Sequence, residues 1–169
     1  MNPKRALDDM RTIKQLLTEA ERISRELGEA EPGAEHLLLS AIALPDGTAG
    51  RALGRVDVDA GRIRVALVEE QADALVAVGV PRQQAEMLAV PTPLGDADRP
   101  LLYGAGPTAR EVFTTAGDLA RGAKQGLVGA HVVLAIAGVE RGTVARVLER
   151  LGVDRGALAD AARAELPGA

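Results

Sequence analysis

The chain has 169 residues, enough for one domain or for two small halves that share a core. Its net charge of −4 argues against a general nucleic-acid binder, and the absence of cysteine excludes thiol chemistry and cysteine-based zinc sites. Because no apolar run reaches the roughly 18 residues of a membrane span, we expect a cytoplasmic protein. Because Phe113 and Tyr103 are the only aromatic residues, the core must consist of Leu, Val, Ile and Ala, which favours closely packed helices over a sheet.

Four helices are predicted in the first part of the chain. Apolar residues spaced three or four apart predict a helix from Asp9 to Leu27, and Gly28 is expected to end it. A second helix is expected from Ala34 to about Leu44. Thr48 is expected to cap a short third helix, and Asp59 a fourth.

A helical spacer and a linker are predicted next. Residues 71–89 continue the helical pattern, with a break at Gly79 and with Pro81 as the first residue of a further helix. Residues 90–107 contain four prolines and three glycines, which predicts an irregular linker over most of this stretch.

The first pattern returns after the linker, where four more helical segments are expected. His36 and His131 are 95 residues apart (131 − 36), and so are Arg51 and Arg146 (146 − 51). Gly33 and Gly129 are 96 apart, so the second copy is expected to lack one residue between its Gly and its His. Two copies at one offset predict a duplicated helical unit whose halves pack face to face.

The expected division of the chain follows from this repeat. Residues 1–70 form the first repeat, residues 71–107 the spacer and linker, and residues 108–169 the second repeat, all within one compact domain.

The motif "GAEHLLL" at residues 33–39 raises the question of catalysis. Neighbouring residues of a helix point about 100° apart, so Glu35 and His36 are not expected to meet as a catalytic pair. The later "GAHVVLAI" keeps His131 and lacks the acid. With two histidines and no nucleophile motif, the chain is predicted not to be an enzyme, and no cofactor or metal is expected. An acid in the first turn of a helix is favoured by the helix dipole, so we interpret the motif as a helix start used twice.

The repeated unit resembles the Clp N-terminal (Clp-N) repeat, the paired four-helix module that precedes the ATPase rings of the ClpA and ClpC unfoldases. In the first copy, Leu27-Gly28 and "GAEHLLL" match the family pattern. In the second copy the matching residues are Pro107, Ala109, Arg110, Val112 and the stretch "VARVLERLGVD" from Val144 to Asp154. The chain departs from the family at Asp9 and Ala105, where the family has Phe, and by alanine in place of the Thr before the Glu-His pair.

The resemblance implies an all-α fold of two tandem four-helix repeats in a pseudo-two-fold arrangement, with an extra helical spacer and a Pro/Gly-rich linker between them. It implies a non-enzymatic interaction module that binds substrates, adaptors or Clp components in regulated proteolysis. The alternative function is a decoy that binds or sequesters a small molecule such as a cyclic peptide.

The resemblance also suggests binding residues. In the ClpC branch the Glu of each Glu-His motif belongs to a phosphoarginine pocket, and this role carries over to Glu35 alone, with His36 and His131 as further candidates for ligand or partner contact. A helix-start role without a ligand is the favoured alternative for Glu35. Tyr103 is a candidate for lining an apolar groove between the copies, and the alternative there is a loop that anchors its apolar residues on the helices.

Overall fold

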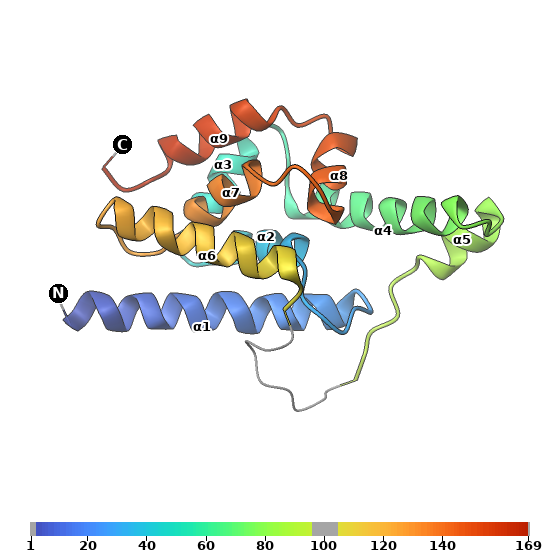
Figure 1. Cartoon of the computed structure of the whole chain (residues 1–169), viewed down its shortest axis with the longest axis horizontal. Coiled ribbons are helices and arrows are strands. Elements are labelled where there is room, and N and C mark those ends of the chain that lie inside the picture. The colour runs from blue at the N-terminus through green and yellow to red at the C-terminus, as the bar shows by residue number, and fades with distance from the viewer. Residues whose placement is uncertain (1–2, 96–104, 169) are drawn as a thin grey trace.

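The computed structural model describes residues 3–95 and 105–168, and every regular element in these two stretches is a helix (Figure 1). The first repeat contains α1 (Pro3–Glu26), α2 (Ala34–Ile42), α3 (Thr48–Gly54) and α4 (Ala60–Ala77). The second contains α6 (Pro107–Gly122), α7 (Gly129–Ala137), α8 (Thr143–Arg150) and α9 (Arg155–Ala164), and α5 (Arg82–Leu88) lies between the repeats in sequence. The predicted all-α double repeat is confirmed.

The hydrophobic core lies around α2 and α7, which pack against each other at the centre of the molecule. These helices are almost fully buried because leucine, valine and isoleucine follow one another on all sides, as in Leu37-Leu38 and Val132-Val133. α1 covers α2, and α6 covers α7. The fourth helix of each repeat crosses to the other repeat, so that α4 packs on α8 and α9 packs on α3.

The same ion-pair cluster occurs twice, once on each side of the pseudo-two-fold axis. Glu165, just after α9, accepts from Arg51 of α3 at 2.6 Å and from Arg55, just after α3, at 2.7 Å. The equivalent acid on α4 is Glu70, and its partners on α8 are Arg146 and Arg150. Each of these clusters joins the two repeats, which confirms the pseudo-two-fold arrangement.

Gly28 ends α1 as predicted. Its φ is +83°, and the N–H of Glu29 donates to the carbonyl of Ser24 at 2.8 Å. The glycine is also needed for space, because a Cβ at residue 28 would lie 2.9 Å from the carbonyl oxygen of Thr92. The start of the linker therefore passes directly over the end of α1, where Leu94 N–H donates to the carbonyl of Arg25 at 2.9 Å.

Two local expectations are wrong. α1 begins at Pro3, well before Asp9, because its first turns need no buried stripe to remain helical. Thr48 is the first residue of α3, and its hydroxyl does not cap that helix. It accepts instead from the N–H of Ala130 at 2.8 Å, at the start of α7. Asp59 does cap α4, since its carboxylate accepts from Arg62 N–H at 2.9 Å.

The residue missing from the second copy lies in a different place from the one expected. Val128 precedes α7 in the same extended conformation with which Gly33 precedes α2, and these two residues are 95 apart. The shorter connection is the loop between the first and second helices of the repeat, residues 27–33 in the first copy and 123–128 in the second.

α4 is longer than its counterpart α9, with 18 residues against 10. Its second half and α5 leave the body of the molecule together, at the right of Figure 1. The predicted boundary at residue 70 falls inside α4, so the division at residues 70 and 107 stays a prediction. Within the described residues, none of the helices combines the length and the apolar composition that a membrane span requires.

Candidate binding site at the start of helix α2

His36 closes the first turn of α2. Gly33 precedes the helix in an extended conformation, and His36 occupies the third helical position. From there its Nδ1 accepts the backbone N–H of Gly33 at 2.8 Å, as a Glu or Gln does in a capping box. The first role of this histidine is therefore to begin a helix.

Glu35 also serves the start of the helix. Its side chain is 8% exposed, and its carboxylate accepts its own backbone N–H. The carboxylate lies over Gly33, and a Cβ on residue 33 would displace it. Burial raises the pKa of Glu35, while its own N–H and the charge of Arg146 act in the opposite direction.

The side chains of Glu35 and His36 do meet, contrary to expectation. Glu35 Oε1 lies 3.3 Å from His36 Nδ1, because the acid curls back toward the helix N-terminus. The contact does not make a catalytic pair. Nδ1 already accepts from Gly33, so it has no proton to donate to the acid, and the neutral ring carries its proton on Nε2.

Glu29 completes the site from the loop after α1. Its Oε2 lies 4.0 Å from His36 Nε2, which is buried and has no hydrogen-bond partner in the described part of the chain. Burial raises the pKa of Glu29 to about 7, and the charge of Glu35 adds to this effect. Burial lowers the pKa of His36 to about 4, and the charge of Arg64 adds to that shift, so the ring is neutral near pH 7.

Glu29, Glu35 and His36 bring possible ligand atoms within 4.8 Å of one another. Such a group invites comparison with a metal site. His36 offers an N–H at Nε2 and no free lone pair, so it does not fit a metal ligand without a change of tautomer. The two carboxylates fit a cationic group that brings its own N–H donors, such as a guanidinium.

Sequence reasoning singled out Glu35 and His36 but missed Glu29. The available signal was the helix-ending Gly28, because a left-handed residue at this position turns the next side chain back toward the following helix.

The second copy keeps the histidine and loses both acids. His131 Nδ1 accepts from Val128 N–H at 3.2 Å, and its Nε2 is buried and unpartnered among the described residues. Ala130 stands where Glu35 does, and Gln125 follows a left-handed residue as Glu29 does. Burial lowers the pKa of His131 too.

The first repeat replaces the missing acid of the second copy. Asp46 accepts from Gly129 N–H at 3.2 Å and from Thr48 N–H at 2.9 Å, while the Thr48 hydroxyl accepts from Ala130 N–H. The start of α7 therefore has its carboxylate from Asp46, which accounts for the loss of the second Glu. His131 lies at this separate place and does not join Glu35 and His36, and Tyr103 lies outside the described residues.

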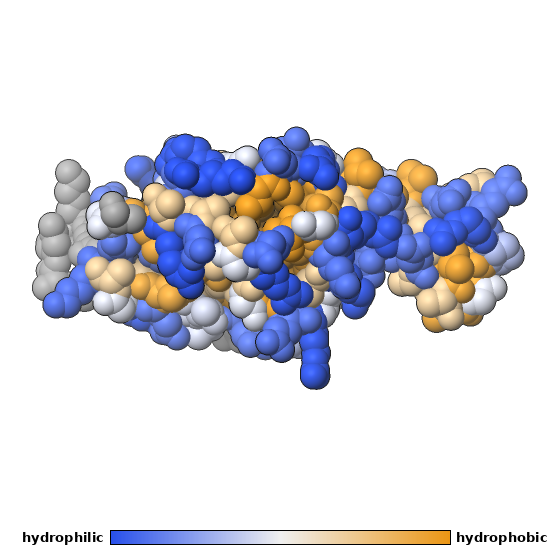
Figure 2. Space-filling view, turned by 90° about the horizontal axis from the view of Figure 1, so that it is seen from above, coloured by the Kyte–Doolittle hydropathy of each residue, from blue (hydrophilic) through white to orange (hydrophobic). Residues whose placement is uncertain are grey.

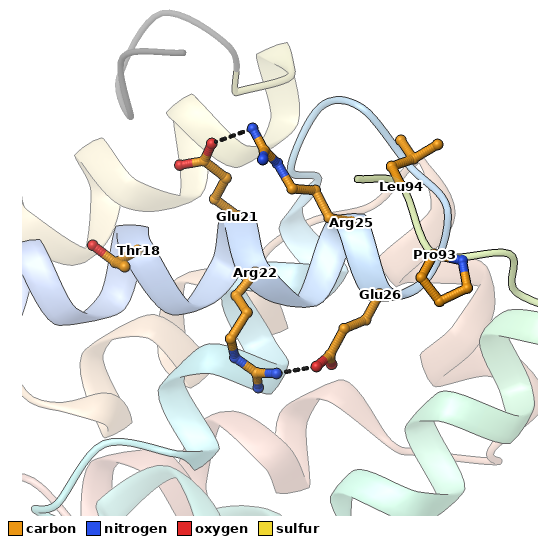
Figure 3. Close-up of a pocket in the computed structure, with 7 residues that line it drawn as sticks. All are labelled: Thr18, Glu21, Arg22, Arg25, Glu26, Pro93 and Leu94. Atoms are coloured by element: carbon orange, nitrogen blue, oxygen red, sulfur yellow. Dashed lines mark hydrogen bonds and ion pairs between the residues drawn. The ribbon is translucent and has the colours of Figure 1, made fainter. Parts of the chain in front are cut away.

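Two further cavities lie against α1. One, of about 230 Å³, lies between α1 and α6, where the apolar residues Ile13, Phe113 and Leu127 share its lining with polar side chains, among them Asp9 and Arg121. The other, of about 290 Å³, lies between α1 and the start of the linker (Figure 3). Glu21 and Arg25 pair beside it at 3.0 Å, and the charges that line this second cavity are thus already neutralised within α1.

Comparison with known proteins shows similarity to a family model and to solved structures. Residues 11–89 match the family model of the Clp repeat (R) N-terminal domain. The fold is similar to the crystal structure of the N-terminal domain of the caseinolytic protease associated chaperone ClpD from Arabidopsis thaliana, with a TM-score of 0.53 and 20% sequence identity over 92% of this chain and 89% of that one. No curated protein sequence matches the chain.

Proposed function

Since residues 11–89 match the family model of the Clp repeat (R) N-terminal domain, we propose that this chain is a non-enzymatic protein-interaction module of Clp-dependent proteolysis in the cytoplasm. Its partners in this proposal are substrates, adaptors or other Clp components. The observation that carries the proposal is the acidic pair Glu29–Glu35, set beside a buried histidine N–H at the start of α2.

The chemistry of the acidic pair suggests which peptide group it recognises. Two carboxylates accept the N–H groups of a guanidinium, and removal from water strengthens that pairing. The charge of Arg146 acts on Glu35 while Arg146 also pairs with Glu70, so a cation lies near the place where an anionic group joined to the guanidinium would sit. A guanidinium joined to a phosphate, as in phosphoarginine, matches both features and agrees with the resemblance to the ClpC branch.

Affinity capture from the lysate of the native host tests the proposal. The bait proteins are the wild type, Glu35→Gln, and the matched control Glu31→Gln, which removes the same charge from an exposed side chain in the loop that precedes α2. Glutamine keeps an acceptor for the helix N–H, so the variant should fold. We expect Clp components or Clp substrates with the wild type and the control, and their loss with Glu35→Gln.

Calorimetric titration with free phosphoarginine separates the ligand from the partner. Binding by the wild type and the control, with a loss of about tenfold or more in Glu35→Gln, supports the guanidinium site. Equal capture by all three baits would move the interaction to another surface, and capture of no Clp protein would count against the function itself.

The groove between α1 and α6 favours a second candidate, the binding of a small apolar molecule such as a cyclic peptide. Ile13, Phe113 and Leu127 give it an apolar lining at the junction of the two repeats. A thermal-shift screen of cyclic peptides tests this function, since a ligand at 100 times its Kd adds about 2.7 kcal/mol of stability. A shift that persists in Phe113→Ala would place the ligand elsewhere.

A further inference from the structure

The cavity between α1 and α6 contains polar groups that specify the chemistry of an occupant. Hydrophobic residues also gather on the projecting end formed by the second half of α4 and α5 (Figure 2), but no buried side-chain atom on that end lacks a hydrogen-bond partner among the described residues. In the cavity, apolar side chains lie beside polar groups whose capacity to accept hydrogen bonds is only partly used. A site of this composition selects its ligand through those few polar groups.

The apolar lining and the size of the cavity suit a single large side chain. Ile13, Phe113 and Leu127 supply the apolar surface. The volume of about 230 Å³ is below the roughly 300–1,000 Å³ of a pocket for a drug-sized molecule. The cavity therefore holds one apolar residue of a larger ligand.

Asp9 and Gln125 make the polar part of the lining an acceptor of hydrogen bonds. Asp9 Oδ1 accepts from Leu127 N–H at 3.1 Å, and the carboxylate has further lone pairs on both of its oxygens. Gln125 donates through Nε2 to the carbonyl of Pro167, and its buried Oε1 has no hydrogen-bond partner among the described residues. The carbonyl dipole of this amide adds to the negative potential of the lining.

The charges of the lining favour a cationic donor. Asp9 is the one acid among the described residues that line the cavity, and it has no ion-pair partner in the described part of the chain. Arg121 is the one base among them, and Asp118 of the same helix pairs with it. The guanidinium is thus neutralised within α6, while the charge of Asp9 remains available to a ligand.

We propose that this cavity binds the amino-terminal residue of a peptide when that residue is large and apolar. The apolar side chain packs against Ile13, Phe113 and Leu127, and the α-ammonium group donates to Asp9. The inference rests on the proposed role in protein interaction and names a class of partner, proteins whose first residue is apolar and exposed.

The same groups distinguish this ligand from related ones. An internal peptide segment and a cyclic peptide have no α-ammonium group to pair with Asp9. A free amino acid brings a carboxylate as well, and the only base of the described lining, Arg121, is already paired. The amino terminus of a peptide has the ammonium group without the carboxylate beside it.

Calorimetric titration of the full chain with short peptides tests the proposal. The probe begins with leucine, continues with glycine and serine, and ends in an amide, and its control is the same peptide with an acetylated amino group. We expect the probe to bind and acetylation to reduce its affinity by about tenfold or more, because it removes the charge that faces Asp9. Changes in amide chemical shifts should centre on Leu127 N–H, which shares the carboxylate of Asp9.

A pair of variants tests the position of the ammonium group. Asp9→Asn removes the charge and keeps an oxygen for Leu127 N–H, so it should fold and should bind the probe about tenfold or more weakly. The matched control is Asp8→Asn, which removes the same charge from an exposed neighbour outside the cavity lining and should bind as the wild type does. Circular dichroism of each variant confirms that its helices are retained.

Each contrary result overturns a definite part of the proposal. Equal affinity for the free and the acetylated peptide would overturn the ammonium contact, and unchanged affinity in Asp9→Asn would overturn the site. Leucine amide that binds as tightly as the probe would overturn the peptide as the ligand and assign the cavity to small amines. Capture of Clp partners depends on Glu35 and this binding on Asp9, so either can fail while the other is retained.

Discussion

His36 and His131 occupy the same position in their helices, and their surroundings decide what else each one does. Both accept a backbone N–H through Nδ1, so both begin a helix, as the repeated motif predicted. Among the described residues, His36 lies in a cluster with two glutamates, Glu29 and Glu35, whereas His131 is acted on by the charges of Asp46 and Asp9. The sequence shows that one acid is missing from the second copy, but it does not show that Asp46 replaces it, because that contact joins residues 83 positions apart.

Glu29 makes stability depend on pH. Burial and the nearby charge of Glu35 raise its pKa to about 7, above the ordinary value of 4.5. A carboxyl with a raised folded-state pKa contributes stability that is fully present below pH 4.5 and is lost as pH rises toward 7. We therefore expect Glu29→Gln to be more stable than the wild type at pH 8, by about 1 kcal/mol or less because the side chain is 42% exposed and partly screened.

The pH dependence that Glu29 contributes is measured as the difference in unfolding free energy between Glu29→Gln and the wild type. This comparison is needed because His36, which is present in both proteins, changes stability with pH in the opposite direction. Its lowered pKa costs stability as pH falls from 6.5 toward 4. Urea unfolding at pH 5 and pH 8 should give a larger benefit of Glu29→Gln at pH 8. The control Glu31→Gln should show no such change, and an equal effect of Glu29→Gln at both pH values would contradict the raised pKa.

The capping role of the histidines is open to a direct test in the second copy, which lacks the counterparts of Glu29 and Glu35. His131→Leu leaves the N–H of Val128 without its acceptor, and we expect a loss of about 1–2 kcal/mol in the free energy of unfolding. His131→Gln should lose less, because glutamine can reach the same N–H from the third helical position. Urea unfolding of both variants measures the difference. Equal losses would mean that ring packing, and not the hydrogen bond, makes the contribution.

At the scale of the helices, local signals predict the end of α1 and the cap of α4, but not the start of α1 or the contacts between distant residues. Gly28 as a helix end and Asp59 as a cap rest on the conformation of neighbouring residues, and the structure confirms both. The sequence predicts that the Thr48 hydroxyl caps α3, because the N–H groups nearest to it along the chain are those of α3. Its partner Ala130 becomes a neighbour only when the repeats pack, and the same is true of Glu29 and the ring of His36.

At Gly129 the start of α7 lies close against α2 and α3 of the first repeat. A Cβ there would lie 2.8 Å from the Cβ of Ala49 and 2.9 Å from the carbonyl oxygen of Ala41, and backbone atoms cannot move away easily. We expect Gly129→Ala to lower the free energy of unfolding by about 1–3 kcal/mol. Gly54→Ala is the control, because a Cβ at the end of α3 meets nothing within 4 Å, and it should be neutral or stabilising by about 0.5–1 kcal/mol. Chemical denaturation of both proteins decides the question, and equal stability would contradict the close packing.

At the scale of the whole molecule, the fold was predictable and the interlocking of the repeats was not. A repeat at a fixed offset indicates two similar units, but it does not reveal which helix of one unit packs on the other. In the structure each fourth helix also packs on the other repeat, α4 on α8 and α9 on α3, while α9 keeps its packing on α7 of its own repeat. The candidate site depends on this contact between the repeats, because Arg146 on α8 of the second repeat acts on Glu35 of the first.

Because each fourth helix also packs on the other repeat, we expect that neither repeat folds alone. A fragment of residues 1–95 would expose the faces of α2 and α3 that α7 and α9 cover, and it would lose the salt bridges of Glu70. A fragment of residues 105–169 would lose the corresponding contacts, and a unit of this length buries too little surface to compensate. We expect each fragment to give a weakly helical circular dichroism spectrum without cooperative unfolding, and the equimolar mixture to regain the helicity and the cooperative transition of the full chain. A fragment that unfolds cooperatively by itself would show that the repeats are independent domains, and the coupling of Arg146 to Glu35 would then be a contact between domains and not a property of one core.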